Sequence, residues 1–186
     1  MANPLLDQTS PNELAACSQV IELTEKIDSV PRVVEIVARD LATLDRERRP
    51  RTWRDAPVDI KLGFGWADER GEIPALTGTL DMTLAAVCQR CLEPFGLPLQ
   101  VSLKMLFLEP AKTLSGWDEF EVWELAESTI RPLDVAEEAL IMALPLSAMH
   151  VPGDVECQPA IATHVESADT VRPFADLRMQ MDEKNN

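Results

Sequence analysis

Apolar and polar side chains broadly alternate through much of the first half of this sequence. The alternation covers residues 20–27, 58–66, 73–87 and 96–108. Because successive side chains of a strand point to opposite faces of a sheet, this period predicts four strands. Each of them should have one buried and one solvated face. Short turns between the last three predict two consecutive hairpins, and hence an antiparallel sheet.

A period of three to four residues replaces the alternation in two segments, residues 32–45 and 132–144. Pro31 directly precedes the first segment and Pro132 opens the second, and proline is tolerated in the first turn of a helix; Ser29 is a candidate N-cap of the first. Both patterns predict amphipathic helices. A sheet with one apolar face needs a cover, so we predict an α+β fold in which two helices cover an antiparallel β-sheet.

The chain has 186 residues, which is enough for one domain with a substantial core. We expect a loose N-terminal arm over residues 1–18, a single domain over 19–177 and a frayed tail over 178–186, because both ends lack periodicity. No apolar run approaches the roughly 20 residues that span a bilayer, and the N-terminus does not resemble a signal peptide. We therefore expect a cytoplasmic protein with no membrane contact.

Cysteine residues provide the clearest candidate chemistry. Cys88 and Cys91 form a C-x-x-C turn between the third and fourth expected strands, and His150 and Cys157 follow the second expected helix. Cytosolic cysteines are more often metal ligands or redox groups than disulfides. Three thiolates and one imidazole suit tetrahedral zinc, so one structural zinc ion on Cys88, Cys91, His150 and Cys157 is our working hypothesis.

Other interpretations of these residues stay open. Cys88 and Cys91 can be small apolar residues at a strand end, with His150 interacting with free carbonyl groups at a helix C-terminus. A redox dithiol is a further interpretation, with Arg90 lying between the two thiols. The flanking strands argue against it, because thioredoxin-like motifs place the reactive thiol at a helix N-terminus, where its pKa is lowered.

An arginine-rich segment between the first helix and the second strand is the second candidate site. Guanidinium groups bind phosphates through paired hydrogen bonds, and an indole ring can stack on a base, so RNA is the expected ligand. The net charge of −15 restricts such contact to a local patch. Alternatively, the segment is a charged linker or pairs with acidic residues near 119–127. The candidate residues are Arg46, Arg48, Arg49, Arg51, Trp53 and Arg54.

No arrangement of residues predicts catalysis. The chain has two histidines and lacks a Gly-rich phosphate loop, a nucleophile elbow and a metalloprotease motif, so we expect a protein that is not an enzyme. Residues 109–138 hold nine acidic and two basic side chains. This acidic segment is an alternative binding surface, suited to a basic protein.

Three segments resemble the YceD family, the large ribosomal RNA subunit accumulation proteins. They are CQRCLEPF at residues 88–95, ALPLSAMH at 143–150 and RPFADL at 172–177. The resemblance implies a bacterial ribosome-biogenesis factor needed for synthesis, processing or stability of large-subunit ribosomal RNA. It implies binding of that RNA or its precursor, or of a ribosomal protein. The alternative is an acidic interaction module that holds a basic ribosomal protein without touching RNA.

Overall fold

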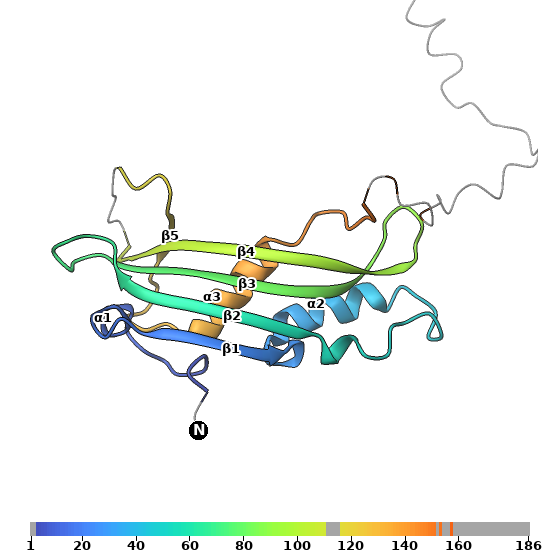
Figure 1. Cartoon of the computed structure of the whole chain (residues 1–186), viewed down its shortest axis with the longest axis horizontal. Helices are drawn as coiled ribbons and strands as arrows, with labels where there is room; N and C mark the ends of the chain where they lie inside the picture. Colours follow the sequence, from blue (N-terminus) through green and yellow to red (C-terminus); the bar gives the residue numbers. More distant parts are fainter. Residues whose placement is uncertain (1–2, 111–115, 152, 154–156, 158–186) are drawn as a thin grey trace, which may run out of the picture.

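The computed structural model describes residues 3–110, 116–151, 153 and 157. The expected tail 178–186 and the RPFADL segment at 172–177 lie outside these residues. Five strands form one sheet in the order β1-β2-β3-β4-β5 (Figure 1). The strands are β1 Val20–Lys26, β2 Pro57–Trp66, β3 Pro74–Val87, β4 Pro94–Leu108 and β5 Glu121–Glu124.

The first four strands pair antiparallel, which confirms the α+β fold class, and β5 pairs parallel to β4 at the sheet edge. The alternation seen in the sequence matches the burial of β3. Leu76, Leu80 and Leu84 are buried on one face, whereas Thr77 and Thr79 are exposed on the other. β5 was not expected in the sheet, because four residues are too few to establish a period.

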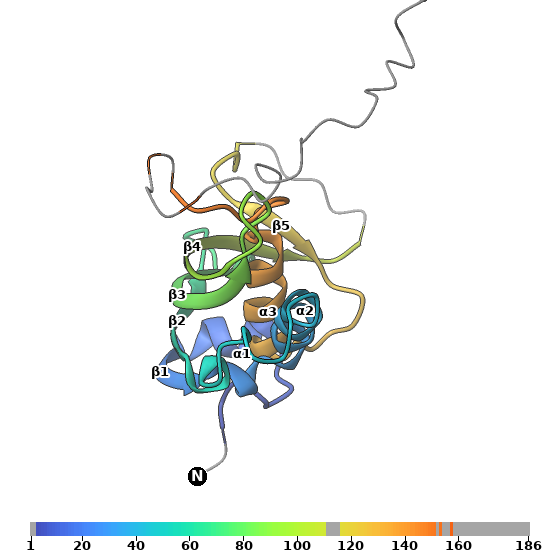
Figure 2. The ribbon, with the colours of Figure 1, turned by 90° about the vertical axis from the view of Figure 1, so that its right-hand side faces the viewer.

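Three helices accompany the sheet: α1 Pro11–Ala16, α2 Pro31–Leu41 and α3 Pro132–Met142. Figure 2 shows α2 and α3 on the same side of the sheet, and apolar residues of both helices join the strands in one core. Within the described residues, no helix is long and apolar enough to cross a membrane.

Helix α1 lies in the segment that was expected to be a loose arm, and here the structure differs from the expectation. Leu5 and Leu14 are buried, and Thr9 pairs with Ile130 in an isolated bridge. The Ser10 hydroxyl accepts a hydrogen bond from the backbone N–H of Asn12 and caps the helix. Six residues are too few to show a helical period, so the sequence pattern did not predict this helix.

The N-terminus of α2 is capped from a distant part of the chain. Val30, not Ser29, occupies the N-cap position, and it makes no side-chain capping bond. A carboxylate oxygen of buried Glu137 in α3 instead accepts the backbone N–H of Arg32 at 2.7 Å. The prediction of Ser29 as the cap is therefore wrong, because a residue 105 positions away supplies the acceptor.

Candidate metal centre and arginine-rich loop

A tight turn joins β3 to β4 and carries the C-x-x-C motif. Val87 pairs with Pro94 across the hairpin, and the backbone N–H of Cys88 donates to the Glu93 carbonyl at 2.9 Å. Leu92 closes the turn in the left-handed region with φ 59° and donates its N–H to the Cys88 carbonyl. This geometry brings the side chains of Cys88 and Cys91 close together at the end of the hairpin.

The segment that follows α3 lies against this turn. The backbone N–H of Gln89 donates to the Ala148 carbonyl at 2.9 Å, which fixes the neighbouring His150 beside the thiols. The His150 ring also packs on Phe95 at the start of β4, with 4.5 Å between ring centroids. Two segments far apart in the sequence thus contribute side chains to one site.

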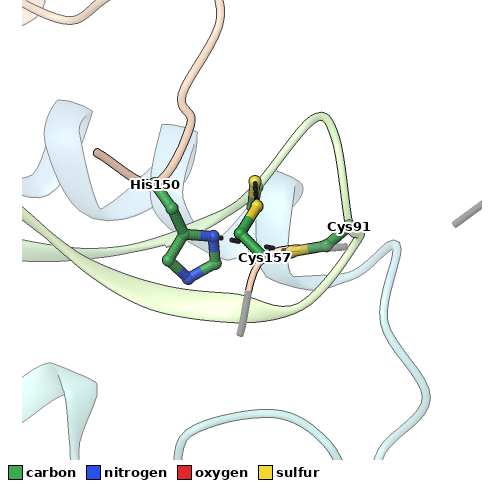
Figure 3. Close-up of side chains that lie close together, drawn as sticks. Cys91, His150 and Cys157 are labelled. Atoms are coloured by element: carbon green, nitrogen blue, oxygen red, sulfur yellow. Dashed lines mark hydrogen bonds between the residues drawn. The ribbon is translucent and has the colours of Figure 1, made fainter. Parts of the chain in front are cut away.

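The four predicted ligand residues come together. Their ligand atoms all lie within 4.8 Å of one another, with 3.7 Å between the Cys88 and Cys157 sulfurs. His150 Nδ1 lies 3.5 Å from the Cys91 sulfur, and Figure 3 shows Cys91, His150 and Cys157 pointing toward one another. Zinc–sulfur bonds of about 2.3 Å in a tetrahedron separate two sulfurs by about 3.8 Å. A disulfide would need about 2.05 Å, and all four cysteines are free thiols.

The electrostatics of the cluster favour a bound cation. Burial alone would raise the pKa of the Cys88 thiol, but the backbone N–H groups of Cys91, His150 and Arg90 donate to its sulfur and lower that pKa to about 5. Burial raises the pKa of Cys91, and the neighbouring thiols of Cys88 and Cys157 raise it further. Adjacent thiolates repel one another, and a divalent cation removes that repulsion.

Arg90 adds a second positive group at the site. Its Nε donates to the Cys157 sulfur at 3.1 Å, and this bond raises the pKa of the guanidinium. Three thiolates around Zn²⁺ carry a net charge of −1, which one guanidinium neutralises. The sequence placed Arg90 only between the two thiols, and a contact with Cys157 could not be read from that position.

The donor set fits structural zinc better than redox chemistry. Reactive thiols are usually partly exposed, but Cys88, whose pKa is lowered, is 0% exposed. The motif lies in a strand-to-strand turn rather than at a helix N-terminus. A third thiol and an imidazole complete four donors, and no available position remains for a catalytic water. Cys17 is exposed at the end of α1 and is not part of the cluster.

The arginine-rich loop, residues 42–56, lies at the same end of the molecule as the turn between β3 and β4 (Figure 1). Arg48 donates to the Leu92 carbonyl at 2.8 Å and forms an ion pair with Glu93 at 2.7 Å. Arg49 donates to the carbonyl of Ala42, the C-cap residue of α2, and to that of Leu44 within the loop. The loop is therefore folded onto the domain, in contrast to a free linker.

The other candidate RNA-binding residues form two groups: some contact the domain, and others are exposed without an ion pair to a described residue. Arg54 pairs with Asp28 at 2.9 Å and stacks on the half-buried Trp53 ring. Arg46 and Arg51 are exposed, and no described residue forms an ion pair with either. The carboxylates that pair with the loop belong to Glu93 and Asp28, not to the acidic residues near 119–127.

The chain matches a known protein family. The model of the family described as Large ribosomal RNA subunit accumulation protein YceD matches residues 76–179. The matched range is more than half of the chain and contains all four cluster residues, whereas the arginine-rich loop lies outside it. Searches of curated proteins and of solved structures found no match.

Proposed function

The chain belongs to the YceD family, as its three motifs indicated, and from this premise we propose that it is a zinc-stabilised binding factor for large-subunit ribosomal RNA or its precursor. The description of the family, large ribosomal RNA subunit accumulation protein, supports a role of the chain in large-subunit ribosomal RNA biogenesis. The proposal adds a metal, a binding surface and a location in the bacterial cytoplasm.

The convergence of four donor atoms within 4.8 Å is the observation that carries the proposal. A zinc ion bound there supplies a structural cross-link, because it ties the β3–β4 turn to the segment after α3. The residues that hold it are Cys88, Cys91, His150 and Cys157. Arg90 balances the charge through Cys157, and Phe95 supports the His150 ring.

Arg46 and Arg51 are the proposed phosphate contacts. Both are exposed and free of ion pairs within the described chain, so they can bind an anion without first breaking a salt bridge. Trp53 is half-buried against the core and holds Arg54, which makes both residues supports of the loop. The proposed action is binding, because Cys91 and His150, which lie 3.5 Å apart, both belong to the proposed zinc ligands and would not be free to act as nucleophile and base.

The acidic segment supports a second candidate function. Asp118, Glu121, Glu124 and Glu127 are exposed at the edge strand β5 and its flanks, and no described residue forms an ion pair with them. Exposed Val122 lies among these carboxylates. This surface suits a basic protein, so a ribosomal protein is the second proposed partner.

Crosslinking in cells tests the RNA proposal. Ultraviolet crosslinking of the tagged protein, followed by sequencing of the recovered RNA, should yield reads concentrated on large-subunit ribosomal RNA or its precursor. The double variant Arg46→Glu and Arg51→Glu should reduce recovery at least tenfold. Arg70→Glu is the control, because Arg70 is exposed in the β2–β3 turn, outside the arginine-rich loop.

Background recovery from the wild-type protein would contradict RNA binding. In that case, binding of basic ribosomal proteins should be measured at low and high salt. Binding that weakens with salt and is lost in the variant Glu121→Lys with Glu124→Lys would then support the second function.

A further inference from the structure

We propose that the metal state of the C-x-x-C turn sets the affinity for RNA, because the turn holds the arginine-rich loop in place. The inference rests on the proposed RNA-binding function. It adds a coupling between two sites that are separated in the sequence, and it assigns Arg48 as the residue that connects them.

Arg48 contacts the turn through two acceptors, one on Leu92 and one on Glu93. Its Nη2 donates to the main-chain carbonyl of Leu92, and the same nitrogen lies 2.7 Å from a carboxylate oxygen of Glu93. Leu92 directly follows Cys91, and Glu93 accepts the backbone N–H of Cys88. Any change in the backbone between the two cysteines and Glu93 therefore moves the acceptors of Arg48.

The middle of the loop depends on this contact. Arg49 folds the start of the loop onto Ala42, the C-cap residue of α2, and Arg54 fixes its end to Asp28. Between them, among the described residues, Arg48 makes the hydrogen bonds that tie residues 45–51 to the β-hairpin. Arg46 and Arg51 lie in this middle part, so their positions depend on the hydrogen bond and the ion pair between Arg48 and the turn.

Backbone hydrogen bonds close the turn, and a metal ion shared by its two cysteines would constrain it further. Leu92 has φ 59°, in the left-handed region that is strained for a non-glycine residue. Two cysteines that share one metal ion restrict the backbone on the N-terminal side of Leu92. Without the ion, the clustered sulfurs lose their common partner and the strained turn can relax. The Leu92 carbonyl then moves, and the loop loses its anchor.

Thermodynamic linkage gives the reciprocal consequence. If the metal tightens RNA binding by some factor, RNA must tighten metal binding by the same factor. Couplings between sites are typically about 5-fold to 150-fold. We therefore expect zinc-loaded protein to bind RNA about tenfold more tightly than chelator-treated protein.

The test measures fluorescence anisotropy of a labelled in vitro transcript of large-subunit ribosomal RNA, titrated with zinc-loaded and chelator-treated protein. Arg48→Lys is the informative variant, because lysine keeps the charge but does not keep the planar, multi-donor guanidinium. It should retain zinc in equimolar amount, bind RNA several-fold more weakly than the wild type, and show little further loss on chelation. Because this variant keeps its metal, the affinity of its zinc-loaded form does not depend on the folding of the metal-free protein.

Arg39→Ala is the matched control. Arg39 is an exposed arginine on α2 whose ion pair with Glu35 lies within the same helix, so its removal costs one positive charge without touching the turn. This variant should keep the zinc dependence of the wild type. Equal RNA affinity of zinc-loaded and chelator-treated wild type would overturn the coupling and leave RNA binding intact, as would wild-type behaviour of Arg48→Lys. Absence of RNA binding in every state would overturn the proposed function as well.

Discussion

The carboxylate of Asp40 accepts the backbone N–H of Val87 at 2.8 Å, across 47 positions of sequence. Asp40 lies in the last turn of α2, and Val87 is the last residue of β3, immediately before Cys88. One helix therefore fixes the strand end from which the first metal ligand emerges. The arginine-rich loop continues directly from the same helix, so both candidate sites share this support.

Replacement of Asp40 should destabilise the hairpin end. Asp40→Ala leaves the N–H of buried Val87 without its acceptor, which costs about 1–3 kcal/mol. Asp40→Asn keeps an acceptor oxygen and should cost less. Urea unfolding measures both, and Glu35→Ala is the control on the same helix, because its exposed ion pair with Arg39 contributes at most about 0.5 kcal/mol. Equal midpoints for Asp40→Ala and Glu35→Ala would contradict the role of Asp40.

Glu137 should contribute more to the free energy of unfolding than its neighbour Glu138. The buried carboxylate of Glu137, in α3, accepts a backbone N–H from the first turn of α2. Glu137→Ala removes this acceptor and should lower the free energy of unfolding by about 1–3 kcal/mol. Glu138 pairs with the Arg32 side chain at a partly exposed position, so Glu138→Ala should cost less than about 1 kcal/mol. Thermal unfolding of both variants gives the ranking, and a larger loss for Glu138→Ala would refute it.

Gly78 in β3 is required by the close approach of a neighbouring strand. A Cβ atom at this position would collide with the Lys61 carbonyl oxygen and crowd Leu62 at 3.2 Å. Gly78→Ala should therefore destabilise the protein by at least about 1–3 kcal/mol. Gly65→Ala in β2 is the matched control, because no atom lies within 4 Å of the added methyl group and its effect should stay within about 1 kcal/mol. Similar unfolding midpoints for the two variants would show that the strands can separate at no cost.

The Asp68 carboxylate should contribute to the acid stability of the β2–β3 turn. Partial burial would raise its pKa, but hydrogen bonds from the backbone N–H groups of Ile73, Glu72 and Arg70 outweigh that effect, so the pKa lies below its usual value. A group with a lowered pKa stabilises the folded state above its unfolded pKa of about 3.9, and this contribution fades as the pH falls through the folded pKa.

The stability difference between wild type and Asp68→Asn should accordingly be constant above about pH 5 and shrink toward pH 2. Urea unfolding at a series of pH values measures it. Glu69→Gln is the control. It removes a neighbouring charge, and among the described residues the Glu69 carboxylate accepts no hydrogen bond from the turn. A difference that grows as the pH falls would have the wrong sign for this account.

The sequence predicted those parts of the fold that repeat over many residues. The four long strands and the two longer helices have clear periods, and the resemblance of the three motifs led to the correct family. Helix α1 and strand β5 are too short for a period, and they are positioned by contacts such as the bridge from Thr9 to Ile130. Local pattern carries little information about such contacts.

Long-range contacts also explain what the sequence could not predict at the candidate sites. Residue types and a C-x-x-C spacing were sufficient to propose the four ligands. In contrast, the bonds of Arg48 to Leu92 and Glu93, and of Arg90 to Cys157, depend on how the loop and the turn pack. An arginine in a sequence has no fixed partner, so the loop could equally have been free.

Metal analysis of the purified protein tests the central claim most directly. After washing with a weak chelator, the wild type should contain one zinc per chain, whereas Cys88→Ala and His150→Ala should lose it and unfold at a temperature lower by about 5–10 °C. Cys17→Ala should behave as the wild type, because Cys17 is exposed and outside the cluster. Thiol titration should find one reactive cysteine before strong chelation and four afterwards. Folded, metal-free protein whose stability does not change on addition of zinc would contradict the account.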